Sequence, residues 1–334
     1  MVVSETATLL RIEPFWSWNT PIAWTGFIIL ADSLVYRARG DSWIRSAPRE
    51  FAALALVSIP LWLVFEWFNL YLRNWHYVGL PENLIVRNLG YAWAFATIWP
   101  AIFEGAELAA VVRGSRGSGR AGGSGRAGGS GRPGGAGRAG GSSSANGSGR
   151  AYGSGSANGS GRTDRSGRSD HLDALRLPRQ RNPLVSSDRP DPPDPLDPPD
   201  PRGLRAGATI AAGSLFLAAP FLTPAYAQYL AAPVWLGFIL LLDPINARLG
   251  TERITRERLI NLSLSGLLCG VLWEFWNYWA RSKWIYTVPI MENLKVFEMP
   301  LPGYLGFPAF ALECFTMYVF LRRLITTHGR PIAL

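Results

Sequence analysis

VLWEFWNYWARSKWIY, from Val271 to Tyr286, is the stretch that decides the fold. It places one carboxylate, Glu274, among four tryptophans in a segment that is otherwise typical of a membrane helix. The stretch VFEWFNLYLRNWHY, from Val64 to Tyr77, repeats this arrangement in the first half of the chain. An ionised carboxylate in the middle of a bilayer costs at least about 2.5–3.5 kcal/mol. Both stretches therefore raise the question of what an acidic side chain does in an apolar helix.

Long apolar runs extend on both sides of these stretches. Hydrophobic residues make up 48% of the 334 residues, and charged residues only 17%. A helix needs about 20 apolar residues to cross the hydrocarbon core of a membrane. Seven runs have this character, at 20–38, 51–72, 89–112, 206–223, 229–247, 259–280 and 303–325. The sequence therefore predicts an all-α, polytopic membrane protein with about seven transmembrane helices.

The arginines predict the orientation of these helices in the cell membrane. Short loops that carry Arg and Lys tend to stay on the cytoplasmic side. Clusters of arginine follow the first, third, fifth and seventh apolar runs, and the alternate loops carry fewer positive charges. We therefore expect a multi-pass protein with its N-terminus outside and its C-terminus in the cytoplasm. No cleavable signal peptide is visible, so the first run is the expected targeting element.

Residues 114–205 differ in composition from the rest of the chain. Glycine, serine and arginine dominate the first part, as in RAGGSGRAGGSGRPGGAGRAGG, and RPDPPDPLDPPDPR follows later. The segment holds 15 Arg and 8 Asp and thus carries +7 of the chain's formal charge of +9. It has too few apolar residues to offset the entropy of ordering, so we expect a disordered cytoplasmic linker. An Arg/Gly repeat could bind RNA or anionic lipid, but a solvated tether is the favoured interpretation and nucleic-acid binding is not expected.

The two halves on either side of this linker, residues 1–113 and 206–334, share a series of positions. WTGFIILADS, beginning at Trp24, matches WLGFILLLDP, beginning at Trp235. We interpret the matches as the duplication of a three-helix unit. The run at 206–223 is then a connecting helix that makes the two units parallel, and interfaces between such repeats commonly hold sites. The further matches, in chain order, are Glu66 with Glu274, Asn69 with Asn277, Trp75-x-Tyr77 with Trp284-x-Tyr286, Glu82-Asn83 with Glu292-Asn293, and Glu104 with Glu313.

The repeated Glu-x-x-Asn pattern supplies the first candidate catalytic residues. Glu66 and Asn69 lie on one helix face, as do Glu274 and Asn277, and there the amide can hydrogen-bond the acid. We expect both acids to face a shared cavity between the units, with Asn277 orienting Glu274. The alternative is a structural network that ties the helices together.

The aromatic neighbours of these acids suggest acid catalysis on a lipid-soluble substrate. A neutral carboxylic acid in an apolar pocket can protonate an alkene, ring faces stabilise the resulting cation, and a second acid can remove a proton. Glu274 has the denser aromatic surroundings and is the expected donor, with Glu104 or Glu313 as the acceptor. The three histidines are scattered, and both cysteines lie inside apolar runs, so neither a metal site nor a cofactor is predicted. The expected substrate-binding residues are Trp67, Phe68, Trp75, Tyr77, Phe275, Trp276, Trp284 and Tyr286.

The tandem three-span units, the connecting span and the W-x-Y motif after the second span of each unit resemble the membrane-bound lycopene β-cyclases. More loosely, the layout is similar to that of the seven-span terpene cyclases. The resemblance implies an isoprenoid or other lipid-soluble substrate, and a cyclisation or isomerisation that an acid initiates. The chain lacks the P-x-E-E acidic pair that opens the third span in those cyclases, and RNLGYAWAF and MPLPGYLGF stand in its place. In this interpretation the chain is a divergent relative.

Two other classes of function fit the same pattern. Intramembrane acids, pseudo-symmetry and proline-interrupted spans are also typical of proton- or ion-coupled transporters. A structural or assembly protein would use the acids to hold helices together and the tether to hold a partner. The expected partners are the lipid bilayer and a membrane lipid or isoprenoid, and no feature of the sequence specifies an oligomeric state.

Overall fold

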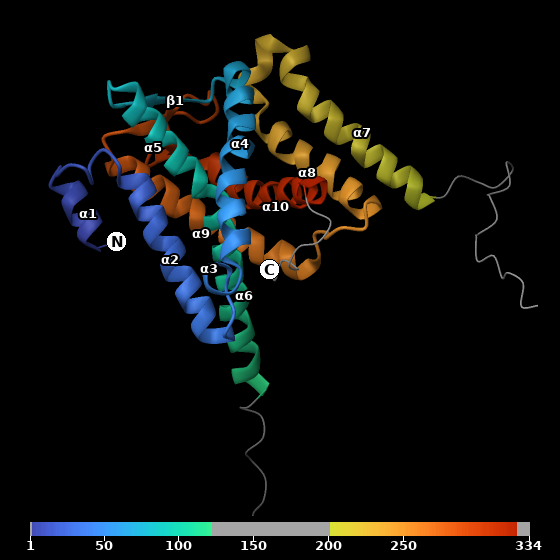
Figure 1. Ribbon diagram of the computed structural model, residues 1–334. Helices are drawn as coiled ribbons and strands as arrows, with labels where there is room; N and C mark the ends of the chain where they lie inside the picture. The colour runs from blue at the N-terminus through green and yellow to red at the C-terminus, as the bar shows by residue number, and fades with distance from the viewer. Residues whose placement is uncertain (1, 122–200, 326–334) are drawn as a thin grey trace, which may run out of the picture. The chain divides into compact units, whose positions relative to one another are not determined.

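The computed structural model describes residues 2–121 and 201–325, and the structure is mostly helical (77%). The all-α prediction is confirmed in this sense. Short helices and strands connect the long helices (Figure 1). The first half contains α1 (Val2–Leu9), α2 (Asn19–Arg39), α3 (Trp43–Ser46), α4 (Pro48–Leu72), β1 (Trp75–Val78), α5 (Leu84–Ala96) and α6 (Ile98–Ala121). The second half contains α7 (Pro201–Leu222), the 3₁₀ turn η1 (Pro224–Tyr229), α8 (Ala231–Arg248), α9 (Arg256–Trp279), β2 (Lys283–Tyr286), β3 (Lys295–Val296), β4 (Met299–Pro300), the 3₁₀ turn η2 (Leu301–Leu305) and α10 (Gly306–Ile325).

The predicted linker is shorter at both ends than the composition suggested. Helix α6 continues to Ala121, and α7 begins at Pro201, so residues 114–121 and 201–205 are helical. The prediction of disorder for 122–200 lies outside the described residues, as does the C-terminal segment 326–334.

Five helical segments of the described chain are long and apolar enough to cross a membrane. Helices α2 and α8 coincide with the two other predicted spans but are not among these five. A membrane protein with several spans is therefore consistent with the structure, and the number seven stays a prediction. The five segments are Pro48–Leu72, Leu84–Gly114, Gly203–Leu222, Arg256–Trp279 and Leu301–Ile325.

Helix α9 exposes apolar side chains and buries polar ones. Leu264, Leu268 and Val271 recur at helical spacing on its exposed face. Its buried face contains Glu274 and Asn277, neither of which is exposed to any extent. A surface helix in water has the opposite arrangement, with its apolar stripe turned to the core. This polarity is typical of a helix whose outer face meets hydrocarbon.

The third predicted span, 89–112, is broken into α5 and α6 at Thr97. Pro100 explains the break, because proline has no N–H for the carbonyl four residues earlier and its ring clashes with that carbonyl. The hydroxyl of Ser58, on α4, bridges a neighbouring pair of backbone groups at this break. It donates to the Phe95 carbonyl and accepts from the Trp99 N–H at 3.2 Å. The break is therefore a hydrogen-bonded joint between α4 and the α5–α6 pair.

Two glycines allow α9 and α10 to approach closely. A Cβ atom on Gly266 would lie 2.3 Å from the Phe307 carbonyl oxygen, and one on Gly270 would lie 2.2 Å from the Phe307 ring. The spacing of these glycines is the small-xxx-small pattern that brings membrane helices into backbone contact. The α9–α10 interface in turn fixes the position of Phe307, which lines the cavity described below.

A two-stranded antiparallel ribbon joins the two halves. Trp75 lies opposite Tyr286, and Tyr77 lies opposite Trp284, so the two W-x-Y motifs pair with each other. Strand β1 follows the end of α4, as Figure 1 shows, and β2 follows the end of α9. Because the strands pair, α4 and α9 end on the same side of the protein. The ribbon therefore places matched residues of both halves around one point.

Candidate functional site

Asn69 and Asn277 hold the outer edges of this ribbon. The Asn277 amide donates to the Trp284 carbonyl at 2.8 Å, and its oxygen accepts from the Trp284 N–H at 2.9 Å. Asn69 makes the same two contacts with Trp75, at 2.8 and 3.3 Å. Each amide thus acts as a neighbouring strand would. The expectation that these amides hydrogen-bond the glutamates is wrong, because both groups of each amide face a tryptophan backbone.

Each half brings a glutamate of the long helix against a tyrosine of the ribbon. The Tyr77 hydroxyl donates to Glu66 Oε1 at 2.5 Å, and the Tyr286 hydroxyl donates to Glu274 Oε1 at 2.9 Å. The two tyrosines occupy matched positions and lie diagonally across the ribbon. The W-x-Y motif therefore delivers a hydroxyl to each acid.

The two acids have different surroundings. Glu66 Oε1 also accepts from the indole N–H groups of Trp62 at 2.8 Å and Trp75 at 3.3 Å. Glu274 is fully buried, and its second oxygen has no hydrogen-bond partner among the described residues. The Trp284 indole N–H and the Glu298 backbone N–H lie near this carboxyl group, outside the geometry of a hydrogen bond. The matched acids are therefore chemically unequal.

The two tyrosines are held in their protonated form. Burial raises the pKa of Tyr77 well above the ordinary value for a phenol, and the neighbouring Glu66 carboxylate raises it further. Burial and then Glu274 raise the pKa of Tyr286 in the same way. Both hydroxyls are therefore donors over the whole physiological pH range.

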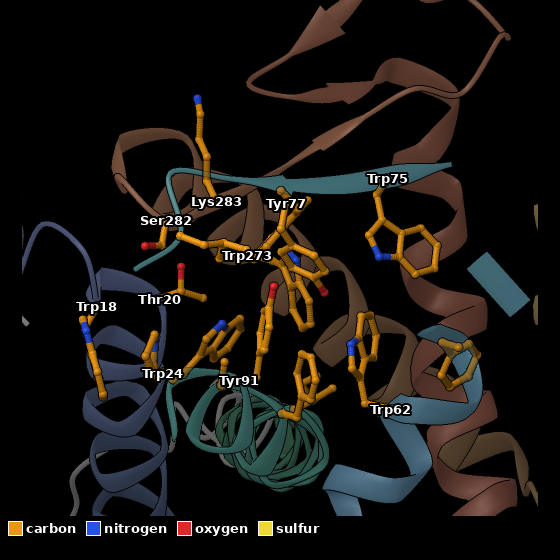
Figure 2. A pocket seen from close by; sticks show the side chains of 18 of the residues that line it. Trp18, Thr20, Trp24, Trp62, Trp75, Tyr77, Tyr91, Trp273, Ser282 and Lys283 are labelled. Carbon is orange, nitrogen blue, oxygen red and sulfur yellow. The ribbon is translucent and has the colours of Figure 1, made fainter. Parts of the chain in front are cut away.

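A cavity of about 150 Å³ lies beneath the ribbon, between the two halves. Figure 2 shows Trp75 and Tyr77 on one side of the ribbon together with Trp62 and Tyr91, whereas Lys283 points away from them. Half of the lining residues are aromatic, and none carries a carboxylate. Another apolar cavity of about 150 Å³ is known to admit benzene. The space therefore suits one ring-sized part of an apolar molecule.

Tryptophans from both halves meet at this cavity. The ring of Trp62 lies 5.6 Å from that of Trp273, and Trp273 lies 5.2 Å from Trp284. Trp24, from α2, lies 5.8 Å from Trp273. Such a cluster presents several π faces to one small volume, and π faces attract a positive charge.

Four of the eight predicted substrate-binding residues line the cavity, namely Trp75, Tyr77, Trp284 and Tyr286. The other four lie elsewhere. Trp67 is 49% exposed on the outside of α4 and packs on Phe221, and Phe275 is 37% exposed and packs on Phe297. Phe68 and Trp276 are buried in the packing of the helices. Proximity to a glutamate in sequence therefore does not bring an aromatic ring to the cavity, because the helix turns successive side chains to different faces.

The predicted acids lie behind the cavity lining. Neither Glu66 nor Glu274 lines the cavity, so the expectation that they face it directly is wrong. Each of these two glutamates is connected to the cavity by the tyrosine to which it is hydrogen-bonded. Glu104 and Glu313 are buried on α6 and α10, and neither lines the cavity. Glu313 has no hydrogen-bond partner for its carboxyl oxygens among the described residues.

Sequence reasoning missed most of the lining. Trp62, Trp273 and Tyr91 contribute rings, and Ser17 and Trp18 contribute from the segment before α2. The match between the two halves could have identified part of the lining, since the matched residues Trp24 and Trp235 both line the cavity.

Comparison with known proteins finds no matching family model, no similar curated protein and no similar solved structure. Within residues 2–121 and 201–325, no group of three or more His, Cys, Asp and Glu side chains could hold a metal ion. Cys269 and Cys314 are both buried and free. The cavity is lined by aromatic and aliphatic side chains, a few hydroxyl groups and two cations, Arg87 and Lys283, and the glutamates lie behind this lining.

Proposed function

We propose that the chain is a multi-pass protein of the cell membrane, built as two parallel three-helix units with α7 as the connecting helix. The shared direction of α4 and α9 supports parallel units, because inverted units would bring their W-x-Y strands to opposite sides. Matched contacts support the duplication. Asp32 accepts from the Ile44 N–H at 2.8 Å, and Asp243 accepts from the Ile254 N–H at 3.0 Å. The N-terminus is proposed to lie outside and the C-terminus in the cytoplasm.

The proposed activity is that of a lycopene cyclase-like enzyme. It would cyclise or isomerise an isoprenoid or another lipid-soluble substrate, with an acid initiating the reaction. The observation that carries this proposal is the aromatic cavity with two tyrosines in its lining, each with its hydroxyl hydrogen-bonded to a glutamate behind the lining. The size of the cavity favours one ring-forming end of a long molecule.

The two acids would have opposite roles. Glu66 has three hydrogen-bond donors around one oxygen, and donors around a carboxyl group favour its charged form. Glu274 has one donor and a buried oxygen without a partner, which suits a neutral acid. Glu274 is therefore the proposed donor, acting through Tyr286, and Glu66 the proposed acceptor, acting through Tyr77.

Each proton transfer in this reaction has a donor and an acceptor, and after each turnover Glu274 regains a proton from water and Glu66 releases one to water. For this step the Tyr286–Glu274 hydrogen bond reverses, so that neutral Glu274 donates to the tyrosine oxygen and the hydroxyl proton turns to the substrate. The Tyr286 hydroxyl then gives its proton to an alkene carbon, whose π electrons form the new C–H bond, as Glu274 passes its own proton to the tyrosine oxygen. The cation that remains is stabilised by the faces of Trp62 and Trp273. A C–H bond beside the cation then breaks, its electrons form the new double bond, and its proton passes to Tyr77 as Tyr77 protonates Glu66. No oxidant or reductant is consumed.

Incorporation of deuterium tests this proposal. Purified protein in lipid vesicles made in D₂O is incubated with lycopene and with shorter acyclic isoprenoids, and the products are analysed by mass spectrometry. We expect a product that carries one deuterium with the wild type and with the exposed control Glu292→Gln. Glu274→Gln and Tyr286→Phe should lose it. Product without deuterium would contradict acid initiation.

A structural role is the second candidate, because the ribbon contacts tie the two halves together. In that case the function of these contacts is to hold the two halves together. They are made by Asn69, by Asn277 and by both glutamate–tyrosine pairs. Glutamine retains the size and the hydrogen-bonding oxygen of Glu274, so Glu274→Gln should leave the stability of the protein unchanged if the role is structural. The wild type should then convert no isoprenoid.

A further inference from the structure

One cation of the cavity lining has no acidic partner within the described residues. Arg87 lies in the first turn of α5, and its Nε donates to the Pro81 carbonyl at 2.9 Å. Its two terminal nitrogens make no hydrogen bond or ion pair in this part of the chain. Lys283, the other cation of the lining, pairs with Glu298 at 2.5 Å. The cavity lining therefore carries one uncompensated positive charge, at Arg87.

This charge lies in an apolar segment. Arg87 belongs to Leu84–Gly114, which is long and apolar enough to cross a membrane. Its neighbours Leu84, Ile85 and Leu89 are exposed. Charged residues in such segments pair with one another or mark a substrate path. The Pro81 carbonyl fixes one edge of the guanidinium and leaves the two terminal nitrogens for a ligand.

Two further features favour an anion at this position. The terminal nitrogens of a guanidinium form a planar fork that matches the oxygens of a carboxylate or phosphate. Arg87 also lies at the N-terminal end of α5, where the helix dipole favours negative charge. Asn83 caps this end by accepting from the N–H groups of Ile85 and Val86 at 2.9 and 3.2 Å.

The face of α5 that lines the cavity changes from charged to aromatic over two turns. Arg87, Gly90, Tyr91 and Ala94 follow one another along it at helical spacing. The Tyr91 ring lies 5.2 Å from the Tyr77 ring, and beyond it the cavity contains only apolar and aromatic side chains on this helix. A molecule that covered this face would need an anionic head and an apolar body.

We infer that the cavity binds an amphipathic lipid whose oxyanion head, a phosphate or carboxylate, pairs with Arg87 while its apolar end lies among Trp62 and Trp273. This inference rests on the proposed function, because it takes the aromatic cavity as the lipid-binding site, and it narrows the substrate class. A purely hydrocarbon substrate would leave the guanidinium without a counter-ion.

Binding of two matched probes tests the inference. Geraniol and geranyl monophosphate share one C10 isoprenoid chain and differ in the head group. The full chain in zwitterionic lipid nanodiscs is titrated with each probe, and quenching of tryptophan fluorescence gives the Kd. Hydrogen bonds to charged groups predict that the wild type binds the phosphate roughly ten- to a hundredfold more tightly.

Substitutions test whether Arg87 causes the preference for the phosphate probe. Arg87→Gln should lose the preference for the phosphate and still bind geraniol, and Arg87→Lys should retain only part of it. Arg256→Gln removes a positive charge from an exposed position outside the cavity lining and should retain all of it. An equal preference in the wild type and Arg87→Gln, or no preference in either, would overturn the inference. If neither probe binds to any variant, the proposed lipid-binding cavity itself fails.

Competition identifies the source of the oxyanion. If phosphatidylglycerol in the nanodisc weakens binding of geranyl monophosphate in the wild type and not in Arg87→Gln, a membrane lipid head group supplies the anion. If it leaves binding unchanged, the anion belongs to a free isoprenoid phosphate or acid, and geranic acid then separates carboxylate from phosphate.

Discussion

Replacing Asn277 by alanine should strongly destabilise the protein, because two buried backbone groups lose their partners. The Asn277 side chain is fully buried and satisfies both the N–H and the carbonyl of Trp284. A buried polar group without a partner costs about 1–3 kcal/mol. We therefore expect Asn277→Ala to lower the free energy of unfolding by about 2–6 kcal/mol.

The assay is unfolding of the protein in mild-detergent micelles by added sodium dodecyl sulfate, followed by tryptophan fluorescence and far-UV circular dichroism. Asn69→Ala is the matched control in the other half. Asn69 makes equivalent contacts but is only half-buried, so water can replace part of them and we expect a smaller loss of about 1–3 kcal/mol. Asn277→Asp should resemble Asn277→Ala, because it removes the donor and turns an oxygen toward the Trp284 carbonyl. A loss below about 0.5 kcal/mol for Asn277→Ala would refute the reasoning, since that is the usual range for substitutions without such a role.

Three further outcomes are expected. Glu274→Gln should lower turnover about 10²- to 10⁴-fold and change the free energy of unfolding by less than about 1 kcal/mol. If the wild type shows no turnover and Glu274→Gln strongly lowers the free energy of unfolding, the structural role is favoured. Gly270→Ala should destabilise the protein by about 1–3 kcal/mol or more, because its Cβ would lie 2.2 Å from the Phe307 ring, and Gly114→Ala, with open space around it, should be neutral in the same detergent unfolding assay. Stability should fall as the pH rises above about 10, by up to about 1.4 kcal/mol per pH unit for each tyrosine. The reason is that Tyr77 and Tyr286 have a raised pKa in the folded state, so the unfolded chain loses their protons first. Tyr77→Phe should make this decline shallower, and an unchanged slope would argue against a buried phenol.

The helices could be predicted from the sequence because each one follows from its own residues. Apolar length alone locates α4, α9 and α10 to within a few residues. The matched positions of the two halves could also be identified from the sequence, since the W-x-Y motifs and the Glu-x-x-Asn patterns recur in order. The pairing of the two motifs with each other could not, because antiparallel register depends on how the halves dock and not on either half alone.

The composition of the cavity was harder to predict, for a geometric reason. Neighbours of Glu274 in sequence, such as Phe275 and Trp276, point to other faces of α9, whereas Trp273 reaches the cavity. Trp18 reaches it from a segment before α2 that has no apolar periodicity to mark it. The break at Thr97 was also missed, although Pro100 three residues later was its cause.

In the proposed duplication, two equivalent units would produce two equivalent sites, but the matched halves differ after the ribbon and contribute differently to the cavity. In the first half, Asn83 caps α5, and this helix supplies Arg87 and Tyr91 to the cavity. In the second half, the matched Asn293 lies in a turn before the β3–β4 hairpin, which packs near β2 and provides Glu298 to Lys283. The same divergence leaves Glu66 with three donors and Glu274 with one. A pair of identical acids could not pass a proton in one direction, because neither would be the better donor. The loss of symmetry after the ribbon is therefore the change that would turn a duplicated scaffold into a site with a donor side and an acceptor side.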